Sequence, residues 1–371
     1  MSATVEVESP APALVTRVEV ENFRSIVRAD VELGRLTVIV GANGSGKTNL
    51  LEAIAVAGAD AAGKLDHEFL SSRGIRPLVP GMVGPRFGAG EPGETRVEVR
   101  GADGRGLTTR VSAEAKFEHW LLSVERELNV RLNRPDPAEL GRISEAIERL
   151  FHRAPQSLPT FLIYTPEYTA LRTFSDEGQI LPLGVRGEGL FRHLVELTRE
   201  HPAVVTEIGE HLRVLDWFDG FVIPSGLGPG EKRLAIRDRY LAADVHLDQR
   251  AANEGFLFLL FIYTLLLSPK TPRFFAIDNA DASLNPLLCA RVVTDIAELA
   301  AKQDKQVILT THNPALLDGL DLSDGAQRLL VCERDLDGHT RFRRVPAPAD
   351  RTVNLSEAFM RGYLGGLPRS F

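Results

Sequence analysis

The chain of 371 residues is long enough for one large α/β domain or for two domains of ordinary size. Hydrophobic residues make up 44% and charged residues 25%, which excludes an intrinsically disordered chain. The net charge of -7 argues against a protein whose main role is to coat nucleic acid.

The first ordered lobe, expected over 15–112, begins with strands that lead to a glycine-rich loop. Apolar and polar residues alternate over 18–33, which predicts half-buried strands. Residues 36–40 run apolar without alternation and predict a central strand that is buried on both faces. We expect a helix from Lys47, directly after the loop, and a hairpin over 97–111.

The middle of the chain, 113–215, predicts a helical insertion. Apolar residues recur at spacings of three and four over 117–151 and 190–197. The segment has no sustained heptads, which excludes a long coiled coil. The Gly- and Pro-rich stretch 77–93, ahead of the insertion, predicts a mobile loop.

The last part of the chain, 216–371, predicts a second α/β lobe. We expect the breaker cluster 224–230 to return the chain to this lobe. An apolar helix, an apolar strand ending at Asp278, an amphipathic helix and a strand over 306–311 then follow. Alternation of this kind predicts a parallel sheet with covering helices. A hairpin is expected over 328–345.

Cysteine usage and the N-terminal segment favour the cytoplasm. Cys289 and Cys332 lie in no CxxC or Cys/His pattern, so we expect neither a disulfide framework nor structural zinc. Residues 1–14 are acidic and lack the features of a signal peptide, and predict a flexible tail. The most apolar stretch, 256–267, is shorter than the roughly 20 residues of a membrane span. We therefore expect a cytoplasmic protein without membrane association.

Two loose groups of arginines bear on nucleic-acid binding. We interpret both as solvated or partner-facing surface, because blocks of charge are usually solubilising, and a DNA track is the alternative. The groups are Arg73, Arg76 and Arg86, and Arg328, Arg334, Arg341, Arg343, Arg344 and Arg351.

A phosphate-binding pattern gives the strongest functional signal. The segment 41–48 fits G-x-x-x-x-G-K-[ST] and lies between a buried strand and a helix, as the pattern requires. Lys47 would reach the β- and γ-phosphates, while Thr48 and the strand-end Asp278 would hold Mg²⁺. The sequence therefore predicts an ATP and Mg²⁺ site. Its candidate nucleotide-binding residues in this segment are Gly41, Asn43, Gly44, Ser45, Gly46, Lys47, Thr48 and Asn49.

An ordered set of motifs resembles the RecF, SMC and OLD families of ATPases. Besides the P-loop, the set consists of Asn22-Phe23-Arg24-Ser25, Asn253-Glu254-Gly255, Ala282-Ser283-Leu284-Asn285-Pro286 and Thr310-Thr311-His312-Asn313-Pro314. The resemblance implies a bilobal ABC-type P-loop NTPase head of the α/β class. Such a head has a mixed, mainly parallel sheet with covering helices, antiparallel N-terminal strands and a helical insertion.

The resemblance also implies roles for single residues. Asn253 and Gly255 would bind the γ-phosphate of the ATP held by the opposite subunit of a homodimer or higher homo-oligomer. Where the family has a serine, this chain has Asn253. The alternative to phosphate binding is that Asn253 serves as the N-cap of the following helix. His312 would sense the γ-phosphate, and the alternative is a purely structural histidine. Arg24 would lie near the phosphates, and the alternative is an ordinary surface arginine.

The residue after Asp278 departs from the family pattern. Family members usually have Glu there as the base that orients the attacking water, whereas this chain has Asn279, whose amide cannot take a proton. Either hydrolysis is slow and ATP acts mainly as a clamp, or Asp281 or His312 aids the water. The candidate catalytic residues are therefore Asp278, Asn279, Asp281 and His312.

The end of the chain bears on the biological role. OLD-type proteins carry a nuclease domain after the head, but the residues after His312 hold no carboxylate cluster fit for two metals. A stand-alone head resembles the ATPase subunits of bacterial anti-phage systems, which control a separately encoded effector such as a nuclease. The alternatives are a DNA-repair or DNA-maintenance ATPase that binds DNA directly, and a non-hydrolysing nucleotide-dependent scaffold.

Overall fold

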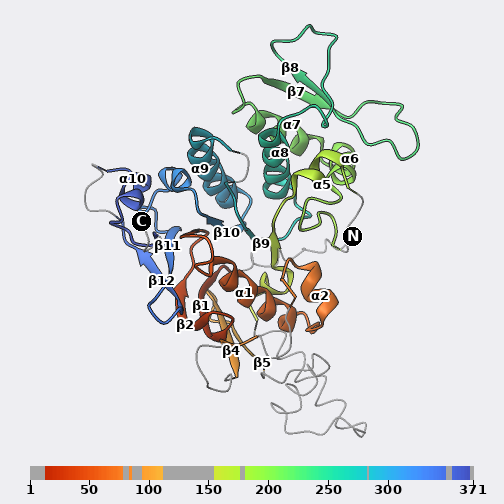
Figure 1. The fold of residues 1–371 in the computed structure, drawn as a ribbon. Helices are drawn as coiled ribbons and strands as arrows, with labels where there is room; N and C mark the ends of the chain where they lie inside the picture. Colours follow the sequence, from red (N-terminus) through yellow and green to blue (C-terminus); the bar gives the residue numbers. More distant parts are fainter. Residues whose placement is uncertain are drawn as a thin grey trace, which may run out of the picture.

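The computed structural model describes residues 13–77, 83–85, 94–111, 154–175, 180–281, 284–347 and 353–367. These residues form two main sheets, a small strand pair and the helices that pack against them (Figure 1). Several predicted features lie outside the described residues: most of the tail, most of the 77–93 loop, the helices expected over 117–151, and Ala282 and Ser283.

The N-terminal lobe is built on a four-stranded antiparallel sheet with the order β2-β1-β4-β5. Its strands are β1 (Val15–Phe23), β2 (Ile26–Glu32), β4 (Thr95–Gly101) and β5 (Gly106–Val111). The apolar positions that alternate in the sequence, such as Val18 and Val20, are fully buried. The predicted strands and hairpin are thus confirmed.

A six-stranded sheet carries the site, with the order β12-β11-β3-β10-β9-β6. Only the edge strand β12 runs antiparallel to its neighbour. Every residue of β3 and β10 is buried, as expected for central strands that are covered on both faces. The strands are β3 (Leu36–Val40), β6 (Leu162–Tyr164), β9 (Phe274–Ile277), β10 (Gln306–Thr311), β11 (Gln327–Arg334) and β12 (Thr340–Val345).

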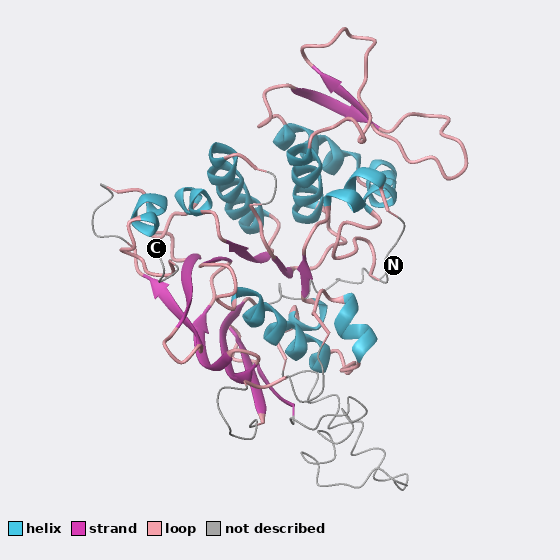
Figure 2. Cartoon of the chain, in the orientation of Figure 1, coloured by secondary structure: helices cyan, strands magenta, loops and turns pink. Residues whose placement is uncertain are grey.

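The two faces of this sheet contribute to separate cores. Val38 and Val40 of β3 face one core, and Ile39 between them faces the other. Helix α1 (Lys47–Ala61) fills the core between the two sheets, while α8 (Glu254–Leu267) and α9 (Pro286–Lys302) cover the opposite face (Figure 2). The α/β fold class with both sheet types is as predicted.

Shorter helices complete the two lobes. Helices α5, α6 and α7 join the core around α8, and α10 packs against the 3-10 helix η2. Their bounds are α2 (His67–Ser72), α5 (Tyr168–Thr173), α6 (Leu190–Glu200), α7 (Pro202–Leu212), α10 (Leu355–Met360), η1 (Leu158–Thr160) and η2 (Pro314–Gly319).

Two details differ from the sequence-based expectation. The breaker cluster 224–230 does not lead into the second lobe but lies in the loop between β7 (Phe218–Val222) and β8 (Ala235–Asp238), an antiparallel pair that projects from the helical side (Figure 1). The expected insertion 113–215 contains β6, which pairs with β9 as an edge strand of the main sheet. A strand of three residues is too short to show the alternation of apolar and polar residues that predicts a strand. The helical pattern around it therefore determined the prediction for the whole segment.

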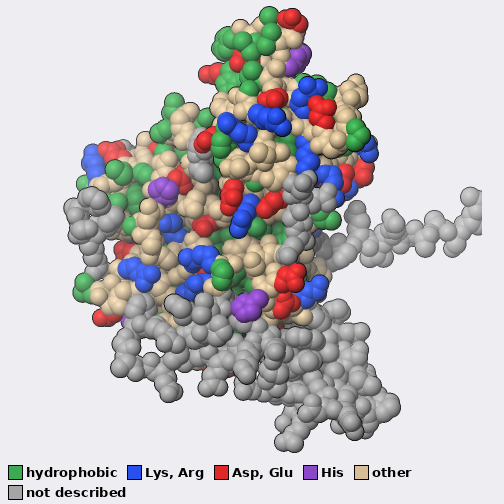
Figure 3. Space-filling view, turned by 45° about the vertical axis from the view of Figure 1, so that its right-hand side comes forward, with side chains coloured by type: hydrophobic (Ala, Val, Ile, Leu, Met, Phe, Trp, Pro, Cys, Tyr) green, Lys and Arg blue, Asp and Glu red, His purple; other side chains and the backbone are tan. Residues whose placement is uncertain are grey.

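The apolar stretch 256–267 belongs to α8, and all twelve of these residues are buried. Within the described part of the chain, no helix is long and apolar enough to cross a membrane. On the face shown in Figure 3, acidic and basic side chains are interspersed rather than separated into fields of one sign. Such mixing is typical of a solvated surface.

A buried histidine makes the helical layer sensitive to pH. The side chain of His193 in α6 is fully buried, and its Nε2 lies 2.8 Å from Ser268 Oγ, at the end of α8. Burial lowers the pKa of His193 from 6.5 to about 4. The folded protein therefore binds fewer protons than the unfolded chain between these two values, and its stability falls as the pH drops through this window.

We expect the parent to lose on the order of 2–3 kcal/mol of unfolding free energy through this group between pH 6.5 and 4. Replacing the imidazole by an amide in His193→Gln removes that proton uptake, so the pH dependence should be flatter by the same amount. Urea unfolding at a series of pH values measures it. His201→Gln, at the exposed end of the same helix, is the control and should keep the parental slope.

Candidate functional site

The phosphate-binding loop lies where β3 ends and α1 begins. Two of its glycines are required by close packing. A Cβ on Gly41 would lie 2.1 Å from Cys332 O, and a Cβ on Gly46 would lie 2.2 Å from Thr340 Oγ1. Gly46 also has a φ of 107°, which L side chains rarely adopt. Strand β11 and the start of β12 therefore press the loop into its conformation.

Lys47 is held inside the loop. Its Nζ donates hydrogen bonds to Gly41 O at 2.8 Å and to Ala42 O at 3.0 Å. Burial lowers the pKa of the ammonium group. The carbonyls hold the cation at the mouth of the loop, where a phosphate group can replace them as its partner.

The end of β9 supplies a carboxylate beside the loop. Thr48 Oγ1 donates a hydrogen bond of 2.9 Å to Asp278 Oδ2, and the hydroxyl of Thr310 binds the other carboxylate oxygen. Hydroxyl and carboxylate oxygens are ligands that Mg²⁺ prefers, so Thr48 and Asp278 can hold this ion with its waters. The donor set thus fits the metal that the sequence predicts.

The three parallel strands β3, β9 and β10 end side by side. The register pairs Val40 with Thr311 and Ile277 with Leu309, which brings the loop, Asp278 and His312 to one edge of the sheet. Ligands of open α/β sheets bind at this carboxyl edge.

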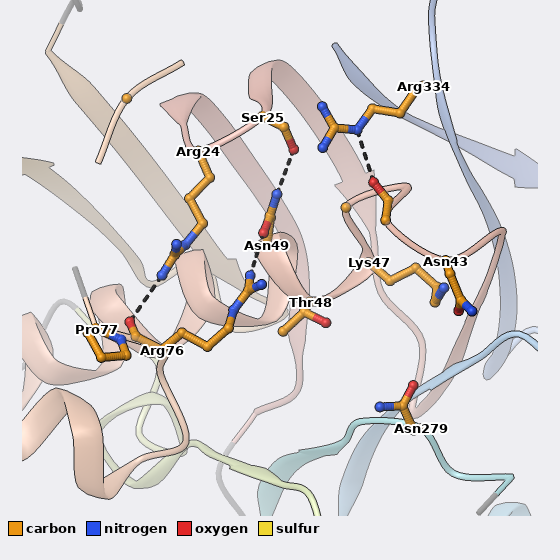
Figure 4. Close-up of a pocket in the computed structure, with 13 residues that line it drawn as sticks. Arg24, Ser25, Asn43, Lys47, Thr48, Asn49, Arg76, Pro77, Asn279 and Arg334 are labelled. Atoms are coloured by element: carbon orange, nitrogen blue, oxygen red, sulfur yellow. Dashed lines mark hydrogen bonds between the residues drawn. The ribbon is translucent and has the colours of Figure 1, made fainter. Parts of the chain in front are cut away.

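Asn279, Asp281 and His312 occupy different environments at this edge. Asn279 has a φ of 57°, is exposed and faces the pocket beside Thr48 and Lys47 (Figure 4). The Asp281 side chain is 7% exposed, accepts a hydrogen bond of 2.9 Å from Thr311 Oγ1 and lies 3.4 Å from His312 Nε2. Asp281 and His312 thus form a pair, and neither lines the pocket with Asn279.

The pocket over the loop has a volume of about 580 Å³ and a strongly basic lining. Its cationic residues are Arg24, Lys47, Arg76 and Arg334, and no carboxylate side chain occurs among the described residues that line it. A site of this charge is suited to a polyanion such as a triphosphate.

One buried carboxylate fixes two of these arginines. Glu52 of α1 is fully buried and forms ion pairs of 2.5 Å with Arg24 Nε and 2.8 Å with Arg76 Nε. Arg76 Nη2 also donates to Asn49 Oδ1 at 2.8 Å, and Asn49 Nδ2 donates to Ser25 Oγ at 2.6 Å. The guanidinium groups are therefore held in place before any ligand arrives.

Two family models match parts of the chain that contain this site. A model described as "AAA domain" matches residues 17–116, and one described as "AAA domain, putative AbiEii toxin, Type IV TA system" matches residues 247–318. The first range holds the phosphate-binding loop, and the second holds Asp278 and His312. A search of curated proteins finds no match to this sequence.

The comparison with solved structures finds SMC head domains. An SmcHead bound to the C-winged helix domain of ScpA matches with a TM-score of 0.52 at 15% identity, over 90% of this chain and 98% of that chain. The SMC head domain from Thermotoga maritima gives a TM-score of 0.45 at 14% identity, over 90% of this chain and 99% of that one. The chain has an ABC-type P-loop NTPase fold, similar to that of an SMC head domain.

The predicted signature position lies at the start of α8. Asn253 is the N-cap of the helix, since its Oδ1 accepts a hydrogen bond of 2.8 Å from Phe256 N. The N-cap interpretation is thus confirmed. Asn253 and Gly255 do not line the pocket over the loop, and their role towards a second subunit stays a prediction.

Sequence reasoning missed two pocket residues of the head. It assigned Arg76 and Arg334 to surface groups, but both line the pocket, and Arg334 Nε donates to Gly44 O at 3.1 Å. Arg76 follows a helix that packs on α1, and Arg334 ends a strand that pairs with β3. No local pattern could have placed either beside the loop.

The turn between β11 and β12 brings possible ligand atoms of Asp335, Asp337 and His339 within 4.8 Å of one another. The carboxylate of Asp335, however, already accepts hydrogen bonds from His339 N at 2.8 Å and from Arg341 Nε at 3.0 Å. These bonds explain the cluster as a turn that its own side chains stabilise.

Lys47→Ala should weaken binding of Mg-ATP by a factor of about 10 to 100, because a charged hydrogen bond contributes roughly 1.5–3 kcal/mol. Calorimetric titration of the folded variant measures the affinity, and circular dichroism checks the fold. Lys64→Ala, at an exposed position just after the same helix, is the control and should bind as the parent does. Equal affinity of the parent and a folded Lys47→Ala protein would contradict the assignment of the loop.

Proposed function

We propose that this head binds Mg-ATP between two copies of itself and hydrolyses it slowly, so that nucleotide acts mainly as a clamp. The observation that carries the proposal is the contrast between the two sides of the pocket. On the phosphate side, Lys47, Thr48 and Asp278 are in place and hydrogen-bonded. On the water side, the residue that follows Asp278 is an amide, Asn279, which cannot act as a base.

The nearest alternative base supports slow turnover. Asp281 is engaged by Thr311 and His312, and it does not line the pocket. The hydrogen bond from Thr311 and the contact with His312 hold this carboxylate at the end of β10. His312, with a side chain that is 51% exposed, is better placed to respond to nucleotide than to be held as a fixed base.

In cells, we infer that the clamp controls a separately encoded effector in anti-phage defence. The family model over 247–318 carries a toxin–antitoxin description, and the SmcHead of the same fold is bound to part of a separate protein. Purification of the tagged chain from its native host with Mg-ATP tests this role. A co-purifying enzyme would support it, and DNA-stimulated, salt-sensitive ATPase activity without such a partner would instead indicate a DNA-maintenance role.

We expect the parent to turn over at or below roughly 1 per second. Asn279→Glu should raise steady-state phosphate release by about tenfold or more, because a positioned base commonly contributes a factor of about 10² to 10⁴. Asn279 has a positive φ, so a longer side chain strains the backbone there. Asn279→Gln is the matched control, since it carries the same strain without a carboxylate. Fast parental turnover that is lost in Asp281→Asn would show that Asp281 is the base.

Gly255→Asp should weaken ATP-dependent dimerisation about tenfold, because a carboxylate in the first turn of α8 repels the phosphate of the partner's nucleotide. An acidic residue in the first turn is compatible with the helix itself. Light scattering with a non-hydrolysable ATP analogue measures the association. Gly209→Asp in α7, where an added Cβ meets no atom within 4 Å, introduces the same charge elsewhere and should dimerise as the parent does.

A further inference from the structure

The segment after α10 lies directly against the phosphate-binding loop. Ala42 N, within the loop, donates a hydrogen bond of 3.1 Å to Gly366 O, across more than 300 positions of sequence. We call residues 363–367 the strap. None of the motifs in the sequence includes this segment, and Gly366 is buried at the point of contact.

Both strands of the C-terminal hairpin hold the strap in this place. Gly366 N donates to Glu333 Oε2 of β11 at 3.2 Å, and the guanidinium of Arg343 in β12 binds Leu364 O. Gly366 has a φ of 79°, and a Cβ there would lie 2.6 Å from Val331 Cγ1 and 3.1 Å from Phe359 Cε2. Both neighbours are buried, so only glycine fits with the strap docked.

The other end of this region is tied to the His312 side of the site. Helix α10 leads into the strap and packs against η2, which begins directly after Asn313. Ser356 N and Ser356 Oγ donate to the two carboxylate oxygens of Asp318 in η2, at 2.9 Å and 2.6 Å. A continuous path of contacts therefore joins the segment that follows His312, through α10 and the strap, to the phosphate-binding loop.

We propose that the strap is a positioning element for nucleotide binding, with the carbonyl of Gly366 as the group that fixes Ala42 in the loop. A docked strap favours the loop conformation in which the N–H groups are arranged for phosphate. When the strap is undocked, the nucleotide must itself order the loop, and the free energy spent on this ordering lowers the binding affinity. By linkage, nucleotide must in turn stabilise the docked strap. The C-terminal region thereby sets the affinity of the head for nucleotide.

The test compares two glycines with nearly the same positive φ, Gly366 at 79° and Gly362 at 76°. Gly366→Ala should weaken Mg-ATP binding by about five- to tenfold in a calorimetric titration. Gly362→Ala adds the same methyl group at a φ of 76°, but this Cβ meets only Leu367 Cδ1, at 3.8 Å, so its affinity should stay within about twofold of the parent. Thermal unfolding of both proteins without nucleotide separates strap docking from the general strain of an alanine at positive φ.

A second pair of variants avoids any added bulk. Glu333→Ala removes the acceptor of Gly366 N and should also weaken binding, whereas Glu333→Gln keeps an acceptor oxygen and should restore affinity towards that of the parent. In the parent, Mg-ATP should slow amide hydrogen exchange over residues 363–367, which a purely structural strap would not show.

The outcomes distinguish this proposal from the clamp function. If the parent binds Mg-ATP and both Gly366→Ala and Glu333→Ala bind equally well, the strap has no positioning role, whatever the rate of hydrolysis. Unchanged exchange of the strap in saturating Mg-ATP would overturn the coupling. Fast hydrolysis by the parent, by contrast, would refute the clamp and leave the strap proposal standing.

Discussion

The hydrogen bond between Thr48 and Asp278 is the contact on which the site depends. It joins the first turn of α1 to the end of β9, two segments separated by 230 positions in the sequence, at 2.9 Å. The hydroxyl of Thr310 binds the second oxygen of the same carboxylate, so β10 is included as well. This bond requires the parallel register of β3, β10 and β9, and it therefore links the packing of the whole sheet to the geometry of one small set of oxygen atoms.

The cationic side chains of the pocket need a negative charge nearby to be stable next to one another. Several guanidinium and ammonium groups close together repel one another, and the repulsion is stronger where water is excluded. Glu52 meets this requirement from inside α1 by pairing with Arg24 and Arg76, while the loop carbonyls surround Lys47. The arrangement leaves the pocket attractive to a polyanion because the compensating oxygens lie behind the cations.

The phosphate-binding loop is held from outside as well as by its own glycines. Thr340 Oγ1 donates to Ser45 O at 2.8 Å, Arg334 Nε to Gly44 O at 3.1 Å, and Gly366 O accepts from Ala42 N at 3.1 Å. All three partners come from residues after β10. Residues near the end of the chain thus hold the conformation of a loop that lies within its first fifty residues.

The sequence by itself determined the elements whose signal is local. The short runs rich in apolar residues predicted β3, β9 and β10 as strands. The spacing of the glycines, Lys47 and Thr48 predicted the loop with its helix. Both signals are local, because each depends on a few neighbouring residues. The structure adds the features that depend on contacts between segments far apart in the sequence. It shows that Arg76 and Arg334 face the pocket, that β6 joins the sheet, and that Gly366 contacts Ala42. Each of these results from pairing and packing between residues far apart in the chain, and only the tertiary structure decides which of them meet.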